Sequence, residues 1–127
     1  MVRMSHPEFT CSVAVRHLPE QSEPETGTNA FAYTVTIRNT GDVAAQLIAR
    51  HWIITDAQGR VEEVRGLAVV GQQPLLAPGE RFEYTSWTRL ASPQGSMRGV
   101  FFCMTEDAHP FEAEVPEFGL SLASALH

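Results

Sequence analysis

The sequence predicts an all-β domain, an immunoglobulin-like or fibronectin type III-like β-sandwich of about seven or more strands. Short runs alternate between apolar and polar positions, which is the period of two that turns one face of a strand inward. Clusters of Gly, Pro, Asn and Asp separate these runs, and no segment has the period of a helix. Many short strands with turns between them favour a sandwich over a closed barrel.

The first half of the chain contains four predicted strands. Residues 11–17 alternate, and residues 19–29 are polar and non-periodic, which predicts a surface loop. Residues 30–39 form the clearest strand, which ends in the turn at 39–42. Residues 46–56 are apolar on both faces, which indicates a strand covered on both sides or one with a bulge. On simple alternation, Leu47 and Ile53 point one way, opposite to Ile48, Trp52 and Ile54, and a turn at 56–59 leads into a return strand at 61–64.

The second half adds four more strands. Pro78 and Gly79 form a turn before a strand at 81–90, in which Phe82 and Tyr84 point inward. The next strand, 97–104, is apolar on both faces and is therefore expected at the centre of a sheet. A turn at 107–110 precedes a strand at 111–115, and a short strand at 118–122 follows Pro116. Residues 1–127 form one domain, with frayed tails at 1–10 and 123–127.

Composition and charge exclude several classes of function. The chain is 43% hydrophobic and 19% charged, so we expect a globular core that needs no disulfide or metal. The net charge is −6, and all nine basic residues are scattered arginines. Nucleic acids and anionic membranes require clustered basic residues, so neither is an expected partner. No apolar run is long enough to span a membrane.

Two features indicate a cytoplasmic protein. The N-terminal residues MVRMSHPEFT lack the apolar stretch and cleavage site of a signal peptide. Cys11 and Cys103 could pair, but without secretion the better interpretation is two buried thiols in a reducing compartment.

Several long strings resemble the ApaG family, also called CorD. They are RHWIITDAQGRVEEVRG (50–66), VVGQQPLLAPGERFEYTS (69–86), LPEQSEP and FAYTVTIRN, and the similarity extends from about residue 13 to residue 122. The resemblance implies a fibronectin type III-like sandwich, an association with cobalt resistance and magnesium efflux, and a role in protein–protein contact. It implies no enzymatic activity. Two positions depart from the family pattern: Ala68 replaces the middle glycine of a GxGxxG loop, and Trp87 replaces a glycine after Tyr-Thr-Ser.

The glycine-spaced segment is a candidate phosphate site, formed by Gly66, Leu67, Ala68, Val69, Val70 and Gly71 with Arg65 beside it. A dinucleotide site needs a helix after the loop, and here prolines and then a strand follow. Backbone amides of an irregular loop can nevertheless bind anions. The interpretation that we favour is a structural loop, with weak pyrophosphate binding as the alternative.

Other candidate residues have more than one interpretation. His51, beside Arg50, is either a proton carrier or ligand, or a strand histidine that hydrogen-bonds to its neighbours, and the second is favoured. Trp87 is either an exposed anchor for a partner or a tryptophan at the rim of the core. Five carboxylates between residues 56 and 83 indicate weak cation binding at most, so we expect no metal site. No nucleophile has a marked base and acid beside it, so we expect no catalytic residue and no cofactor.

The sequence therefore predicts a non-enzymatic binding or adaptor module linked to divalent-cation homeostasis, with an unidentified protein partner. Its expected interaction surface includes Trp87, Arg50 and His51. The alternative is a phosphate- or nucleotide-binding accessory protein that uses residues 66–71. An adaptor predicts an exposed apolar patch or a free sheet edge.

Overall fold

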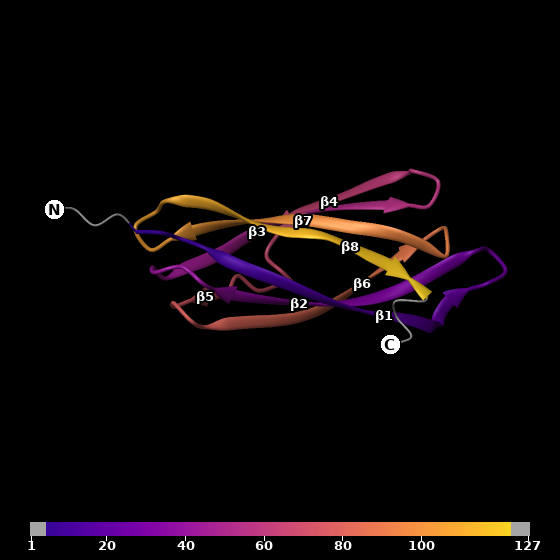
Figure 1. The fold of residues 1–127 in the computed structure, drawn as a ribbon, viewed down its shortest axis with the longest axis horizontal. Coiled ribbons are helices and arrows are strands. Elements are labelled where there is room, and N and C mark those ends of the chain that lie inside the picture. Colours follow the sequence, from indigo (N-terminus) through magenta and orange to yellow (C-terminus); the bar gives the residue numbers. More distant parts are fainter. Residues whose placement is uncertain (1–4, 123–127) are drawn as a thin grey trace.

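The computed structural model describes residues 5–122, which form eight strands in two sheets (Figure 1). The strands are β1 (Phe9–Glu23), β2 (Thr28–Asn39), β3 (Ala45–Asp56), β4 (Val61–Leu67), β5 (Leu75–Leu76), β6 (Arg81–Leu90), β7 (Gln94–Thr105) and β8 (Pro110–Ser121). One sheet has the order β1-β2-β6, and the other has the order β4-β3-β7-β8 with β5 also paired to β3. All pairings are antiparallel. The predicted all-β sandwich is confirmed.

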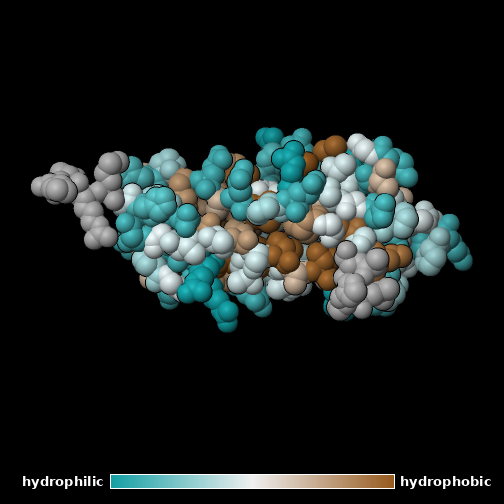
Figure 2. Space-filling view, in the orientation of Figure 1, coloured by the Kyte–Doolittle hydropathy of each residue, from teal (hydrophilic) through white to brown (hydrophobic). Residues whose placement is uncertain are grey.

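The two sheets are the two layers of the molecule, seen edge-on in Figure 1. On the side that faces the viewer, β1 of the smaller sheet lies next to β8 of the larger sheet. Hydrophobic side chains are visible between the hydrophilic layers on this side (Figure 2). The partly buried residues of β1 and β8, which pack on the core here, are Cys11, Val13, Val15, Phe111 and Phe118.

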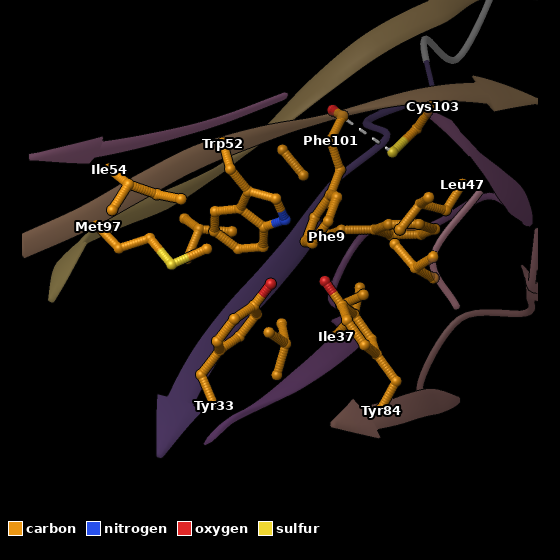
Figure 3. Close-up of a cluster of buried hydrophobic side chains, with 14 of the residues drawn as sticks. Phe9, Tyr33, Ile37, Leu47, Trp52, Ile54, Tyr84, Met97, Phe101 and Cys103 are labelled. Atoms are coloured by element: carbon orange, nitrogen blue, oxygen red, sulfur yellow. Dashed lines mark hydrogen bonds between the residues drawn. The ribbon is translucent and has the colours of Figure 1, made fainter. Parts of the chain in front are cut away.

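Aromatic rings fill the centre of the core (Figure 3). Trp52 of β3 makes edge-to-face contacts with Tyr33 of β2 and Phe101 of β7, with ring centroids 5.6 and 5.7 Å apart. Gly99 lies directly against the Trp52 ring, and a Cβ at position 99 would overlap it. The alternating residues of β2 that were expected on one face are all buried: Phe31, Tyr33, Val35 and Ile37.

A bulge in β3 corrects the expected orientation of its side chains. The register of β3 against β7 shifts between Leu47 and Ala49. The extra residue reverses the alternation, so Leu47 is buried in the core on the same side as Trp52 and Ile54. Grouping Leu47 with Ile53 was therefore wrong, and the bulge is the correct one of the two explanations for the apolar pattern.

Three expected boundaries were also wrong. Residues 19–29 are mostly strand rather than loop, because β1 continues to Glu23 and β2 begins at Thr28. No break separates 111–115 from 118–122, because β8 runs through Pro116 with a register shift in its pairing to β7. Phe9 is a buried residue of β1, so the expected frayed segment 1–10 is ordered from there. The other expected tail, 123–127, lies outside the described residues.

The strand β7 lies inside its sheet as predicted, between β3 and β8. Its second apolar face, however, is not covered. Phe102 is 39% exposed and Met104 is 38% exposed on the outer surface of the larger sheet. This exposed face is part of the candidate site.

Candidate functional site

The glycine-spaced segment is the end of β4 followed by a tight loop. Gly66 and Leu67 belong to the strand, and the backbone turns sharply from Ala68 onward. Ala68, Val70 and Gly71 have positive φ values of 67°, 43° and 80°. Val69, between them, is completely buried in the core. The loop therefore places an apolar side chain between the sheets, and β5 then resumes pairing with β3.

Most of the loop's amides are already bonded within the protein. The Ala68 N–H donates to the carbonyl of Ile48 over 2.8 Å, in the bulge of β3. Val69 and Gln72 bond each other through both backbone groups, at 2.8 and 2.9 Å. An anion nest needs successive N–H groups that point to one empty space, and these N–H groups point to the chain's own carbonyls.

Arg50 binds the same segment from the side of the core. Its Nη1 donates to the carbonyls of Leu67 and Ala68, each at 2.9 Å. To reach them, the guanidinium passes over Gly66, where a Cβ would lie only 2.8 Å from Nη1. Gly66 therefore makes room for an arginine of the protein itself, and Arg50 is engaged in holding the loop.

His51 lies on the outer face of the larger sheet with Glu63 and Arg65 of β4. Its Nε2 is 2.8 Å from Oε1 of Glu63, and Nη2 of Arg65 lies 3.5 Å from the same oxygen. Nε2 must carry the proton in order to donate to the carboxylate, so the 3.3 Å approach of Arg65 Nε to Nε2 brings two donors together. The hydrogen bond from His51 lowers the pKa of Glu63. His51 is thus a strand histidine bonded to its neighbours.

A hollow of about 460 Å³ opens beside this cluster on the outer face of the larger sheet. Two small residues line it, Ala49 of β3, which pairs with Leu67, and Gly66 of β4, which pairs with Arg50. Leu67, which is 72% exposed, and Phe102 of β7 form its apolar walls, and His51 and Arg65 border it. Met104 follows Phe102 on the same face. This arrangement can receive an apolar side chain from another molecule.

Trp87 lies on the other side of the protein. It is 55% exposed on the outer face of the smaller sheet, and the guanidinium carbon of Arg89 lies 5.2 Å from the centre of its ring. The three residues expected on one interaction surface are therefore separated. Trp87 faces outward from β6, His51 faces outward from β3, and Arg50 points between the sheets.

The five carboxylates considered for a cation do not converge. Asp56 and Glu63 have basic partners, Arg60 for the first and His51 with Arg65 for the second. Glu80 accepts from a backbone amide, Glu83 accepts from a threonine, and Glu62 borders a separate hollow. Within residues 5–122, no three His, Cys, Asp or Glu side chains are arranged to hold a metal ion.

Both cysteines are free thiols. Cys103 is buried and Cys11 is half-buried. Burial raises the pKa of each thiol to about 12. A thiol with such a pKa is a poor nucleophile and a poor metal ligand near neutral pH.

The apolar hollow was not identified from the sequence. The signal was present, because residues 97–104 are apolar on both faces. That pattern was interpreted only as a strand at the centre of its sheet, which it is, and an outer face left open for a partner gives the same pattern. No helix in the described part of the chain is long and apolar enough to cross a membrane.

The fold and the site define a class of protein: a fibronectin type III-like sandwich of three strands against five, with an exposed apolar hollow on the larger sheet. Comparison with known proteins identifies the family. The model of the ApaG domain matches residues 19–105, and the chain belongs to this family.

Relatives match the chain over almost its whole length. Protein ApaG of Ralstonia nicotianae is 60% identical over 124 residues, which is 98% of this chain and 100% of that protein. Protein ApaG of Bordetella pertussis is 57% identical over 120 residues, covering 94% of this chain and 92% of that protein. The crystal structure of an ApaA protein from Bordetella pertussis superposes with a TM-score of 0.88 at 57% identity, covering 91% of this chain and 94% of that one.

Proposed function

We propose that this protein is a non-enzymatic binding or adaptor module that acts through protein–protein contacts in divalent-cation homeostasis. The observation that supports a binding role is the hollow between Leu67 and Phe102. Exposed apolar side chains gathered on one face of a sheet are typical of a surface that a partner covers. The link to cobalt resistance and magnesium efflux comes from the family. A cytoplasmic location agrees with two free thiols.

The composition of the hollow suits a protein partner better than a small charged ligand. Its walls are apolar, and both arginines that line it have partners within the chain. Arg65 is paired with Glu63, and Arg50 donates to the carbonyls of Leu67 and Ala68. The centres of protein interfaces are likewise apolar with few charges, and polar groups lie at the rim. We therefore expect a partner to insert an aliphatic or aromatic side chain beside Phe102.

Phosphate or nucleotide binding by residues 66–71 has less support. Arg50 and the amides of Ala68, Val69 and Gln72 already have partners within the chain. An amide NMR titration with pyrophosphate and ATP tests this alternative. Saturable shifts confined to residues 66–71 would favour it over the adaptor.

The adaptor is tested in cells that lack the protein and are sensitive to cobalt. The wild type is expected to restore cobalt tolerance, whereas the double variant Leu67→Ser with Phe102→Ser is expected to fail. Val61→Ser is the matched control, because Val61 is 61% exposed at the other end of the same strand and lies outside the hollow. A correctly folded double variant that restores full tolerance would refute the role of this surface. Stoichiometric binding of Co²⁺ by the purified wild type would contradict the adaptor proposal and indicate a metal-binding protein instead.

A further inference from the structure

The strand β6 is an open edge of the smaller sheet. It pairs with β2 along its full length, from Arg81 to Leu90 in unbroken register, and with no other strand among residues 5–122. It contains no proline. The edge strands β1 and β8 lie beside each other, and each has a register shift and a proline. Proteins usually protect an edge as long and regular as β6, because it can pair with another chain.

The opposite sheet extends beyond this edge. Because β1 lies beside β8, the sheet orders β1-β2-β6 and β8-β7-β3-β4 leave β4 without a strand facing it. The inward residues of β4 are Glu62 and Val64, which pair with the buried Ile54 and Trp52. A hollow of about 280 Å³ lies here, bordered by Glu62 of β4 and by Arg89 and Leu90 of β6. A strand added to β6 would lie opposite β4 and close this gap.

The outer face beside the open edge is basic, although the protein is acidic. Its charged residues on β1, β2 and β6 include four arginines, Arg16, Arg38, Arg81 and Arg89, against the carboxylates of Glu83 and, at the end of β1, Glu23. None of these arginines has an ion pair within the described residues. Arg38 and Arg81 are directly opposite each other, an arrangement that destabilises a sheet on its own. Carboxylates from another molecule would offset the repulsion between these two arginines.

The same charges disfavour a second copy of this chain in the register centred on Thr85. If two β6 strands paired antiparallel about Thr85, Arg81 of each would lie opposite Arg89 of the other. Like charges directly opposite are unfavourable across a strand pair. In the register centred on Ser86, Glu83 of each copy would lie opposite Arg89 of the other, so a second copy is an outcome that the test must distinguish. The excess of arginines on this face is complemented best by an acidic strand.

We propose that the edge of β6 from residue 85 to residue 90 accepts an extended acidic segment of a partner protein as an added strand. Main-chain hydrogen bonds to the open edge hold the segment. Its outward carboxylates meet Arg89, whose guanidinium lies over the exposed ring of Trp87. This site lies on the opposite sheet from the hollow at Leu67 and Phe102, so the two binding surfaces can be tested separately.

The test titrates the full chain with a blocked octapeptide of alternating glutamate and valine. Binding is measured by amide NMR and by hydrogen exchange. The glutamate peptide is expected to shift the amides of residues 85–90 and to slow their exchange. A matched peptide with lysine in place of glutamate is expected to bind more weakly. Arg89→Glu should lower the affinity for the glutamate peptide about fivefold, which is the scale of one exposed ion pair. Arg65→Glu, on the other sheet, should leave this affinity unchanged.

Three results would overturn the proposal. The first is that the amides of β6 fail to respond to the glutamate peptide at millimolar concentration. The second is that both peptides bind equally well, and the third is that the responses map to another strand. A fourth contrary result comes from the free protein. If ultracentrifugation shows a dimer in which all β6 amides are already protected, a second copy occupies the edge.

Discussion

The guanidinium of Arg50 occupies the space into which a side chain at position 66 would project. Nη1 would lie 2.8 Å from a Cβ on Gly66, and it reaches the carbonyls of Leu67 and Ala68 only by crossing this residue. The glycine and the arginine are on adjacent strands and are directly paired in register. The first glycine of the GxxxxG segment thus supports an internal contact that fixes where β4 ends.

Gly66→Ala is expected to destabilise the protein. The arginine head can move away from the new methyl group, but it then loses its two hydrogen bonds, at a cost of about 2 kcal/mol. Chemical denaturation measures the change. In the background of Arg50→Met the bonds are already absent, so the same substitution should cost little. Equal costs in both backgrounds would show that the two residues are not coupled.

Ala68→Gly is expected to stabilise the protein. Ala68 has φ of 67°, a left-handed conformation that costs a residue with a Cβ about 1 kcal/mol relative to glycine. The family pattern has glycine at this position, so the substitution should restore the unstrained backbone. Ala49→Gly, in the interior of β3, is the control and should be destabilising. A loss of stability in Ala68→Gly would show that the backbone at Ala68 is not strained.

The sequence was sufficient for the fold class because the cause of the pattern is local. Phe31, Tyr33, Val35 and Ile37 alternate and are all buried, since a strand turns every second side chain to one face. The errors occurred where one residue changes the alternation. The bulge after Leu47 is stabilised by distant groups, the Ala68 amide and the Gln73 side chain, both of which donate to the Ile48 carbonyl. No local pattern around Leu47 reveals them.

The candidate site was only partly predictable for the same reason. The exposure of Trp87 follows from alternation along its own strand, and the structure agrees. The hollow, in contrast, depends on which strands become neighbours: Leu67 and Phe102 come together only because β4 and β7 both pair with β3 through Ala49. The separation of Trp87 from His51 also depends on the assignment of strands to sheets, which the sequence alone does not fix.

Tyr84→Phe is expected to leave stability unchanged or to raise it by up to about 1 kcal/mol. The Tyr84 hydroxyl is buried and has no hydrogen-bond partner among residues 5–122, and burial raises its pKa. Asn39 provides the contrast, because it is 1% exposed and its amide donates to the carbonyls of Val43 and Leu76. Asn39→Ala should cost about 3 kcal/mol. Comparable losses in thermal melts of both variants would contradict this account.

Stability should depend on pH through Glu63. The hydrogen bond from His51 lowers the pKa of this carboxyl below its ordinary value of 4.5. A lowered pKa in the folded state means that the unfolded chain binds the proton more tightly, so the contribution is complete above pH 4.5 and disappears as the pH falls through the lowered value. Melting temperatures of the wild type and Glu63→Gln should therefore converge on acidification from pH 7. A difference independent of pH would exclude the carboxylate as its cause.

The two cysteines should resist alkylation in the folded protein. Burial raises the pKa of both thiols to about 12, so very little thiolate exists at pH 8. Reaction with iodoacetamide requires the thiolate, and it should be at least about a hundredfold slower than for free cysteine. Mass spectrometry should find both positions modified in urea and neither under native conditions. If slow labelling occurs, the half-buried Cys11 should react before the buried Cys103. Rapid native labelling of Cys103 would show that the strands around it open readily, and it would reopen the question of a reactive thiol in this protein.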